Sequence, residues 1–452
     1  MFEKSTLKKL ALAGLGATLM TVPVRAEVSG ETAYIFNTLL FLIGGFLVMW
    51  MAAGFAMLEA GLVRSKNVAD ICVKNVSLYA IACIMWMLMG YNLMYMDVSG
   101  YFGTFFSLWS PDDAAALAEA AEHDPAGYAA GSDFFFQMVF VATTASIVSG
   151  TVAERIKLFP FFIFTAVLAG LIYPIQGSWE WGGGWLNSDG FVETFGSEFA
   201  DFAGSTLVHS TGGWAALVGA LILGPRLGRY SAEGKVRPMP GSSLPLATLG
   251  TFILWFGWFG FNGASQLAMG SAADGIAISN IFVNTNMAAA GGAFAAMVTT
   301  KLVYKKVDLS MVLNGALAGL VSITAGPDTP LPLEATLIGA VGGVLVVFAV
   351  PFFDKLKIDD VVGAVSVHLV CGIWGTLAVA ITNPDITFMA QLVGVLSIGA
   401  FVVVASAIVW LALKYTIGIR LAEADEELGS DLAELGLEAY PEFGKGSQKL
   451  SF

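Results

Sequence analysis

The chain has little charge. Asp, Glu, Lys and Arg make up only 13% of its 452 residues, whereas 56% of the residues are hydrophobic. A composition this apolar excludes a soluble globular domain and is typical of a polytopic membrane protein. The net charge of −13 reflects carboxylates in loops and in the C-terminal region, and no basic patch indicates a nucleic-acid partner.

Cysteine and the common catalytic motifs are also scarce. The three cysteines, Cys72, Cys83 and Cys371, fall in apolar segments, where they act as small hydrophobic residues rather than as a disulfide or metal framework. The sequence contains no HExxH, GxSxG or GxxxxGK[ST] pattern. We therefore predict that the protein is not an enzyme and holds neither a metal ion nor a cofactor.

The N-terminus begins with MFEKSTLKKLALAGLGATLMTVPVRA, a basic start followed by a short apolar run. The run is shorter than the ~20 residues that a membrane span needs. We therefore predict a cleavable signal peptide over residues 1–26; a short extra transmembrane helix is the alternative. A membrane domain is expected over residues 27–418 and a cytoplasmic tail over 419–452. The tail is acidic and partly amphipathic, which suits either a solvated segment or a regulatory, partner-binding one.

Eleven apolar segments follow the signal, each long enough to cross a bilayer. They are Tyr34–Leu58, Val76–Met96, Phe134–Val152, Leu158–Ile175, Phe202–Leu223, Leu246–Leu267, Ile276–Thr300, Leu309–Ala325, Ala335–Phe352, Val361–Ile381 and Met389–Leu413. The fold class predicted from them is an all-α polytopic membrane protein with eleven transmembrane helices.

Lys and Arg after the signal occur only in alternate connections between these segments and after the last one. They are Arg64, Lys66, Lys74, Arg155, Lys157, Arg226, Arg229, Lys235, Arg237, Lys301, Lys305, Lys306, Lys355, Lys357, Lys414, Arg420, Lys445 and Lys449. Because cytoplasmic loops are enriched in basic residues, we predict that the mature N-terminus lies outside and the C-terminus in the cytoplasm. The expected location is the inner (plasma) membrane.

Two segments of the chain resemble each other. DFAGSTLVHSTGG, residues 201–213, and DVVGAVSVHLVCG, residues 360–372, share Asp, Gly, Val, His and Gly at the same offsets. On the predicted topology the first runs inward and the second outward. This pattern predicts two inverted halves of five helices plus an eleventh helix, an arrangement that builds transporters around a midplane site.

Each repeated segment carries one histidine, His209 or His368, eight residues after an aspartate, Asp201 or Asp360. Eight helical residues rise about 12 Å, so the histidines enter a ~30 Å core from opposite faces to depths about 6 Å apart and can touch. An ionisable pair at this depth indicates a path for a small polar molecule or a proton; the alternative is a neutral histidine bonded to a neighbouring helix. The aspartates are expected to cap their helices, with an indirect functional effect.

Aromatic residues gather at the external ends of several predicted spans. Phe136 and Phe140 start the third span, Trp181 lies in an external loop, and Phe261 and Ser265 end the sixth. The topology brings these five residues to one leaflet. They form either an interfacial aromatic belt or a site that holds a small ammonium-like cation by cation–π attraction and one hydroxyl.

Seven motifs, spread over nearly the whole mature chain, resemble the ammonium transporter family, specifically the Amt and methylammonium permease branch of the Amt/Mep/Rh superfamily. They are AMLEAGLVRSKN at 56–67, VAERI at 152–156, WGGG at 181–184, DFAGSTLVH at 201–209, GWFGFNGAS at 257–265, FVNTNMAAA at 282–290 and VHLVCGIWG at 367–375. The resemblance implies an eleven-helix, N-out fold. It also implies that His209 and His368 are twin pore histidines and that Asp201 is a structural aspartate near the external site. From its equivalent position in the repeat, we expect a structural role for Asp360 as well.

The resemblance further implies an external ammonium site made of Phe140, Trp181 and Ser265, with Phe136 beside it. Phe140 and Phe261 would form a stacked gate above the pore. The implied function is ammonium transport for nitrogen uptake, in which the external site recruits ammonium, which loses a proton, and ammonia passes the histidines with or without that proton. An ammonium sensor and a Rhesus-type gas channel are the alternatives; a short tail argues against a fused signalling domain.

Members of the family are usually homotrimers, accept ammonium and in some cases methylammonium, and often bind a PII-type signal protein at the cytoplasmic face. The chain departs from the family pattern at three positions. Gly363 replaces an acid, Leu369 replaces a glycine, and Leu435 lies where a histidine is usual. The first two departures affect the inner pore, and the third affects the expected PII contact.

Overall fold

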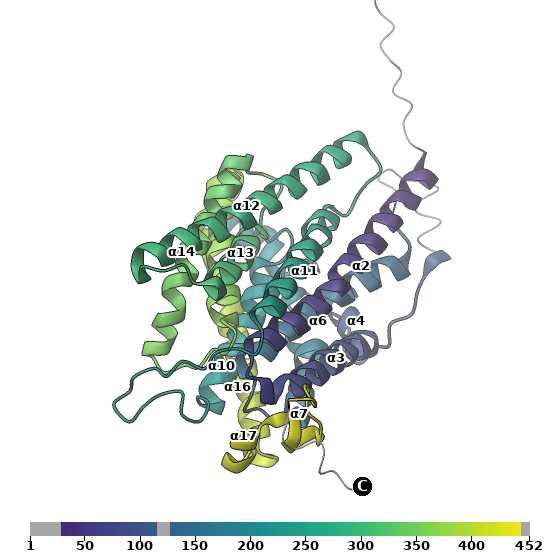
Figure 1. The fold of residues 1–452 in the computed structure, drawn as a ribbon. Helices are drawn as coiled ribbons and strands as arrows, with labels where there is room; N and C mark the ends of the chain where they lie inside the picture. The colour runs from purple at the N-terminus through teal and green to yellow at the C-terminus, as the bar shows by residue number, and fades with distance from the viewer. Residues whose placement is uncertain (1–28, 115–126, 444–452) are drawn as a thin grey trace, which may run out of the picture.

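The computed structural model describes residues 29–114 and 127–443, which form a helical bundle (Figure 1). Within these two ranges there is no β-strand, and only two isolated bridges occur, Ile156 with Arg420 and Tyr230 with Val236. The predicted signal peptide, residues 1–26, lies outside the described residues. The all-α prediction therefore agrees with the structure of the described chain.

The first half of the bundle covers the first five apolar segments; η denotes a short 3-10 or π-helical turn. Its elements are α2 (Gly30–Leu62), η1 (Ser65–Asn67), α3 (Val68–Met85), η2 (Trp86–Gly90), α4 (Tyr91–Tyr95), α6 (Ala130–Val152), α7 (Leu158–Val167), η3 (Leu168–Ile172), α8 (Tyr173–Gly177), η4 (Trp185–Asn187), α9 (Asp189–Phe195), η5 (Ser205–Ser210) and α10 (Thr211–Leu223).

The second half covers the remaining six segments and the tail. Its elements are α11 (Leu244–Gly263), η6 (Ala264–Gln266), α12 (Ala272–Tyr304), α13 (Leu309–Ile323), α14 (Pro332–Lys355), η7 (Val365–Leu369), α15 (Val370–Thr382), α16 (Phe388–Thr416), α17 (Glu423–Leu428) and η8 (Asp431–Leu435). In the described part of the chain, ten helices are long and apolar enough to cross a membrane. Helix α13 has only 15 residues. At a rise of 1.5 Å per residue it is about 22 Å long, which is less than the ~30 Å thickness of the hydrocarbon core.

The second helical segment begins earlier than predicted. The apolar pattern indicates a start at Val76, but α3 begins at Val68 and includes Asp70 and Lys74. The assignment of Lys74 to a cytoplasmic connection is therefore wrong. Its side chain is fully buried and its ammonium donates to the Ser149 carbonyl at 3.1 Å. Hydropathy excludes charged residues from a predicted span. Lys74 is nevertheless buried within α3, because its ammonium group has a polar partner on α6.

Several helices pack with their backbones in direct contact. A Cβ added to Gly250 on α11 would lie 2.3 Å from the Leu58 nitrogen on α2. A Cβ added to Gly343 on α14 would lie 2.1 Å from the Gly292 oxygen on α12. Small residues permit such close approach between membrane helices, so much of the chain's glycine serves packing.

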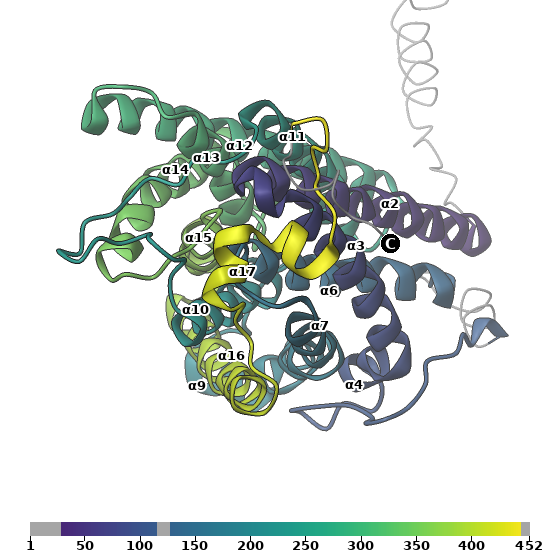
Figure 2. The same ribbon diagram turned by 60° about the horizontal axis from the view of Figure 1, so that its bottom comes forward.

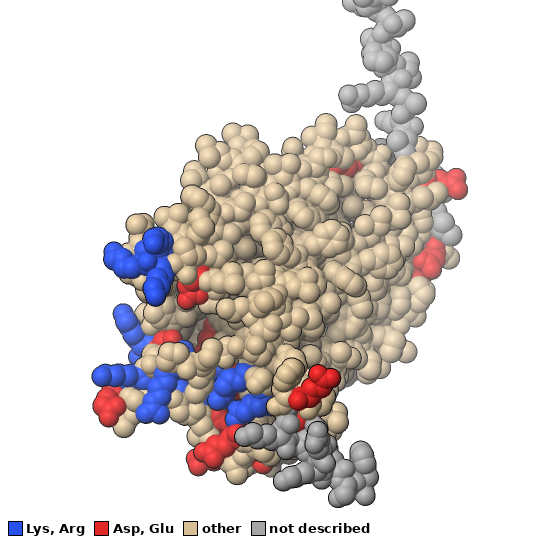
Figure 3. Space-filling model, in the orientation of Figure 1, with Lys and Arg blue, Asp and Glu red and all other residues tan. Residues whose placement is uncertain are grey.

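Basic side chains gather at one end of the bundle. Lys and Arg occupy the lower left of the surface in Figure 3, on the side where α17 lies in Figure 1. Among the residues drawn in colour, the upper end of this face shows none. This asymmetry is the one that the positive-inside rule associates with a cytoplasmic face.

The described part of the tail packs across that end of the bundle, as Figure 2 shows for α17. The Asp431 carboxylate accepts from the backbone N–H of Asp70 at 2.8 Å, and the Glu434 carboxylate accepts from that of Leu158 at 3.1 Å. These N–H groups lie in the first turns of α3 and α7, and N–H groups in a first turn have no acceptor within their own helix. The alternative of a fully solvated tail is therefore wrong for residues 419–443.

Candidate functional site

The two repeated segments fold in the same way. Each histidine lies in a π-helical turn, η5 or η7, and each turn follows a glycine with positive φ, Gly204 at +105° or Gly363 at +84°. Only glycine adopts this conformation without strain. Gly363 is one of the departures from the family pattern. Because Gly204 occupies the equivalent position with a positive φ, Gly363 meets a backbone requirement that both repeats share.

The aspartates begin these turns. The Asp201 carboxylate accepts from four successive backbone N–H groups, those of residues 204–207, at 2.7–3.1 Å. Asp360 accepts from the N–H groups of residues 365–366 at 2.9 and 3.2 Å and from the Thr151 hydroxyl at 2.8 Å. Both side chains therefore cap their helices, as expected.

Burial sets the protonation of these two carboxyl groups. It raises the pKa of Asp201 to about 6, although the four N–H groups act in the opposite direction. It also raises the pKa of Asp360 to about 6, against the hydrogen bonds from Thr151 and the backbone. At neutral pH both carboxylates are still predominantly ionised acceptors.

The two repeats cross each other through glycine. A Cβ on Gly213 would lie 2.7 Å from the Leu369 nitrogen, and a Cβ on Gly372 would lie 2.5 Å from the Ser205 oxygen and 3.1 Å from the Ser210 nitrogen. Each glycine follows its histidine by four residues and contacts the residue that follows the other histidine. The crossing therefore has the pseudo-two-fold symmetry expected from the inverted repeat.

This crossing brings the two histidines into contact. The Nδ1 atoms of His209 and His368 lie 3.2 Å apart, and the rings stack at 5.2 Å with an interplanar angle of 26°. One Nδ1 must donate and the other accept, so the tautomers of the two rings are coupled. The Nε2 atom of His209 is buried and has no protein partner among the described residues.

Aromatic rings continue from the histidines toward the predicted external side. His209 stacks on Trp258 at 4.9 Å and on Phe261 at 5.4 Å. Phe261 in turn stacks on Phe140 at 4.1 Å and 27°. Trp258 was not singled out from the sequence, although its position three residues before Phe261 places it on the same helix face.

Three phenylalanines of the aromatic group are buried and do not fit the alternative of an interfacial belt. Phe140 meets Trp181 edge-on at 6.1 Å and Phe136 at 4.8 Å. Phe136, Phe140 and Phe261 are at most 2% exposed. An interfacial belt requires rings that face lipid, so these three phenylalanines do not form one.

The two polar members of the external group are partly exposed. Trp181 is half-buried, and its indole N–H donates to the Asp201 carbonyl at 3.0 Å. The Ser265 hydroxyl donates to the Phe261 carbonyl at 2.8 Å, one helical turn away. Because that hydroxyl uses its proton on the backbone, its oxygen can accept a hydrogen bond from a bound cation.

A small cavity lies on the predicted inner side of the histidine pair. Its volume is about 20 Å³, and its lining includes His368, Glu59, Asn314 and Gly363. This volume holds about one water molecule. A Cβ at Gly363 would lie 2.6 Å from the Asn314 amide nitrogen, so the acid expected there from the resemblance would require the wall to move. Glu59 was not singled out from the sequence.

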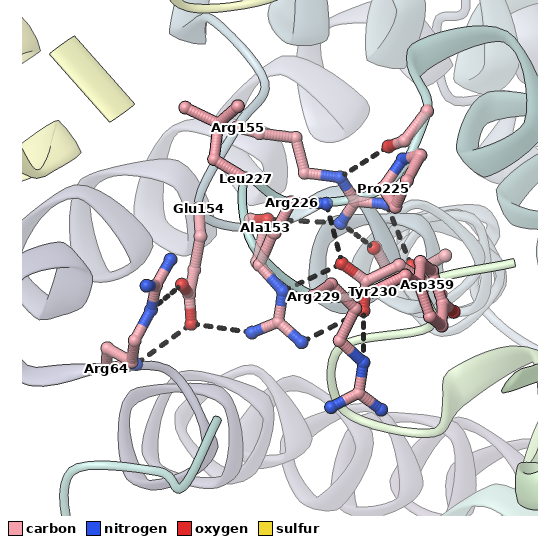
Figure 4. Close-up of polar contacts among 12 residues, drawn as sticks. Arg64, Ala153, Glu154, Arg155, Pro225, Arg226, Leu227, Arg229, Tyr230 and Asp359 are labelled. Carbon is pink, nitrogen blue, oxygen red and sulfur yellow. Dashed lines mark hydrogen bonds and ion pairs between the residues drawn. The ribbon is translucent and has the colours of Figure 1, made fainter. Parts of the chain in front are cut away.

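Buried ion pairs stabilise the predicted inner end of the bundle (Figure 4). Arg226 donates to both Asp359 oxygens at 2.8 and 2.9 Å and to Glu154 at 3.0 Å, and Glu154 also binds Arg64. Burial alone would raise the pKa of Asp359, but the Arg226 hydrogen bonds and the nearby positive charges hold it well below its usual value. Because Asp360 follows directly, this network positions the start of η7.

Known proteins with similar sequences cover most of this chain. The sequence profile of the Ammonium Transporter Family matches residues 39–440. Ammonium transporter Amt2 of Archaeoglobus fulgidus is 40% identical over 428 residues, covering 89% of this chain and 87% of the relative. A putative ammonium transporter of Synechocystis sp. is 40% identical over 413 residues, covering 90% and 89%.

Solved structures are also similar. A structure named Sensor Amt Protein has a TM-score of 0.81 and 34% identity, covering 90% of this chain and 99% of that one. The crystal structure of Candida albicans Mep2 has a TM-score of 0.74 and 28% identity, covering 90% of each chain.

Proposed function

Since the chain belongs to the Ammonium Transporter Family, we propose that it carries ammonium across the membrane through the path between its external aromatic group and its paired histidines. The observation that carries this proposal is the unbroken series of contacts Trp181–Phe140–Phe261–His209–His368.

Recruitment begins at the outer end of this series. The faces of Phe140 and Trp181 attract a small cation by cation–π interaction, and the Ser265 oxygen accepts one of its N–H bonds. Phe136, buried behind Phe140, supports that ring. An ion held in this way is distinguished from a bare metal cation by its ability to donate hydrogen bonds.

Below the site, the stacked rings of Phe140 and Phe261 act as a gate. Their separation of 4.1 Å leaves no room for a molecule between them, so they must part for each passage. A bare cation is costly in the apolar interior of the membrane, and ammonium therefore gives up a proton before it passes. Neutral ammonia then travels along the imidazoles, which offer it hydrogen bonds.

The histidine pair allows two modes of transport. His209 and His368 either shape the path for ammonia alone or also hand the released proton across their 3.2 Å contact. Asp201 acts indirectly in both modes, because it orders the turn that carries His209 and receives the Trp181 indole N–H on its backbone carbonyl.

The wider assignment follows the same family pattern. We propose eleven spans with the N-terminus outside and the C-terminus in the cytoplasm, which the basic end of the bundle supports (Figure 3). The proposed location is the inner membrane, and the assembly is a homotrimer without enzymatic activity. A PII-type protein would dock at the end covered by the tail, where Leu435 replaces the usual histidine.

Two alternative functions would use the same residues. The likeness to a structure named Sensor Amt Protein favours an ammonium sensor that binds without substantial transport. A Rhesus-type gas channel would use the same histidine pair but would depend less on the external aromatic site.

Reconstitution in liposomes separates the three functions. An ammonium pulse is applied while current and internal pH are recorded. A transporter gives flux that falls in Trp181→Leu, and a gas channel gives flux that this substitution leaves unchanged. Ammonium binding without flux would overturn the transporter proposal in favour of a sensor. Unchanged exclusion of K⁺ after both histidines are replaced by alanine would overturn the role of the pair.

A further inference from the structure

A buried carboxylate borders the same inner cavity as the histidine pair. Glu59, near the inner end of α2, is 1% exposed and lines this cavity together with His368. The cavity holds about one water molecule, given its volume of about 20 Å³. A single bridging water can therefore connect the carboxylate with the imidazole.

The two oxygens of Glu59 have different surroundings. Oε2 accepts from the Ser149 hydroxyl at 2.7 Å and from the Asn75 amide at 3.1 Å. Oε1 is buried and has no protein partner among the described residues. A structural acid normally has both oxygens satisfied, because an unpaired buried oxygen is costly. Glu59 is thus held rigidly through one oxygen and left free at the other.

A cation lies on the opposite side of the same polar group. Lys74 donates to the Ser149 carbonyl at 3.1 Å and lies 5.3 Å from the centre of the Phe161 ring. Within the described ranges Glu59 has no ion pair within 4 Å. Lys74 therefore supplies nearby positive charge without occupying the carboxylate, which leaves Oε1 available to a proton.

We propose that Glu59 is the inner proton acceptor of the pathway and the acid that re-forms ammonium; this rests on the proposed transport function. In the first step, the imidazolium of His368 gives a proton to the cavity water as that water gives one to Oε1. This step leaves neutral imidazole, water and the neutral Glu59 acid. In the second step, the acid gives its proton to ammonia, which yields ammonium and restores the Glu59 carboxylate.

The test compares full-length wild type with Glu59→Gln in liposomes. Current and internal pH are recorded after an ammonium pulse. Glutamine keeps the shape and a hydrogen-bonding oxygen but cannot accept the proton. The current should fall at least about tenfold, whereas ammonia flux should persist and make the interior alkaline, because the proton then stays outside.

Two further variants serve as a conservative substitution and as a control. Glu59→Asp draws the carboxyl back by one methylene, so the current should fall severalfold and its H₂O/D₂O ratio should rise. This measurement also decides the matter if Glu59→Gln does not fold. Asp133→Asn is the matched control, since Asp133 is also buried, at 7% exposure, and does not line this cavity; it should keep the wild-type ratio of charge to ammonia.

The outcomes are distinct. Wild-type current in both Glu59 variants would overturn the proposal, and so would a wild-type protein that delivers ammonia without current; the proposed transport function would stand in either case. A wild type that gives no ammonium flux at all would instead overturn the proposed function itself.

Discussion

Replacing Asp201 by asparagine exchanges one of two acceptor oxygens for an NH₂ group, which can only donate. In the wild type both oxygens face backbone N–H groups: Oδ1 accepts from residues 204–205 and Oδ2 from residues 206–207. No rotation of the asparagine side chain avoids setting its NH₂ group against two buried donors that cannot turn away. Asp201→Asn should therefore disrupt the turn that carries His209.

Asp360 provides a matched comparison. One of its oxygens accepts from two backbone N–H groups, but the other accepts only from the Thr151 hydroxyl. In Asp360→Asn the amide oxygen can keep the backbone contacts, while the NH₂ group donates to a hydroxyl that rotates to accept. The same chemical substitution therefore has a compatible partner in one repeat and an incompatible one in the other.

The difference can be stated as a free energy. Each buried donor left unsatisfied costs about 1–3 kcal/mol, so the two at Asp201→Asn cost about 2–6 kcal/mol. Asp360→Asn should change the free energy of unfolding by at most about 1 kcal/mol. The result expected is a large asymmetry between equivalent positions of the two repeats.

Thermal unfolding of the detergent-purified variants, followed by tryptophan fluorescence, measures this asymmetry. The midpoint of Asp201→Asn should fall by several degrees more than that of Asp360→Asn, and its ammonium uptake should be lost in parallel. Equal midpoints for the two variants would refute the reasoning from donors and acceptors, because both substitutions remove the same charge.

Two other substitutions test the crossing and the ionic network. Gly372→Ala places a Cβ 2.5 Å from the Ser205 oxygen, so ammonium uptake by cells should fall at least about tenfold, a change that needs only about 1.4 kcal/mol. The control is Gly275→Ala, whose added Cβ would have no atom within 4 Å and whose uptake should match wild type. Equal uptake by both variants would contradict the packing argument. Asp359→Asn should cost up to about 3–5 kcal/mol at pH 7, because it removes the carboxylate that accepts two side-chain hydrogen bonds from the buried Arg226 and leaves Glu154 to balance that charge. The lowered pKa of Asp359 means that its contribution is present above its unfolded pKa of about 3.9 and is lost as the pH falls further. The wild-type thermal midpoint should thus decline more steeply below pH 4 than that of Asp359→Asn, and parallel curves would contradict the assignment.

Features that depend on periodicity were predictable from the sequence. Two equal spacings and the rise of a helix predict similar depths for His209 and His368, and the inverted repeat makes their contact possible. The predicted topology brings Phe140 and Phe261 to one leaflet, and their stacking is what the resemblance to the ammonium transporter family implies.

Features that depend on a particular partner were not predictable. Glu59 lies in the motif AMLEAGLVRSKN at 56–67, yet only the structure shows that it borders the same cavity as His368. Lys74 was read as a loop residue because hydropathy treats every charge as exposed. The pairing of Arg226 with Asp359 joins positions 133 residues apart, and the sequence spacing carries no information about it. Sequence spacing likewise does not reveal the π-helical turns, which add a residue without changing the apolar pattern.

The crossing through Gly213 and Gly372 also constrains how the chain is made. His209 enters the membrane with the fifth span, but its partner is synthesised 159 residues later. Until η7 is inserted, the nascent chain carries an unpartnered imidazole and an unfilled groove at Gly213, both of which are unfavourable against lipid. The tenth span therefore commits the newly made protein to its final form. Variants that weaken the crossing should lower the amount of protein that survives biogenesis before they alter its affinity for ammonium.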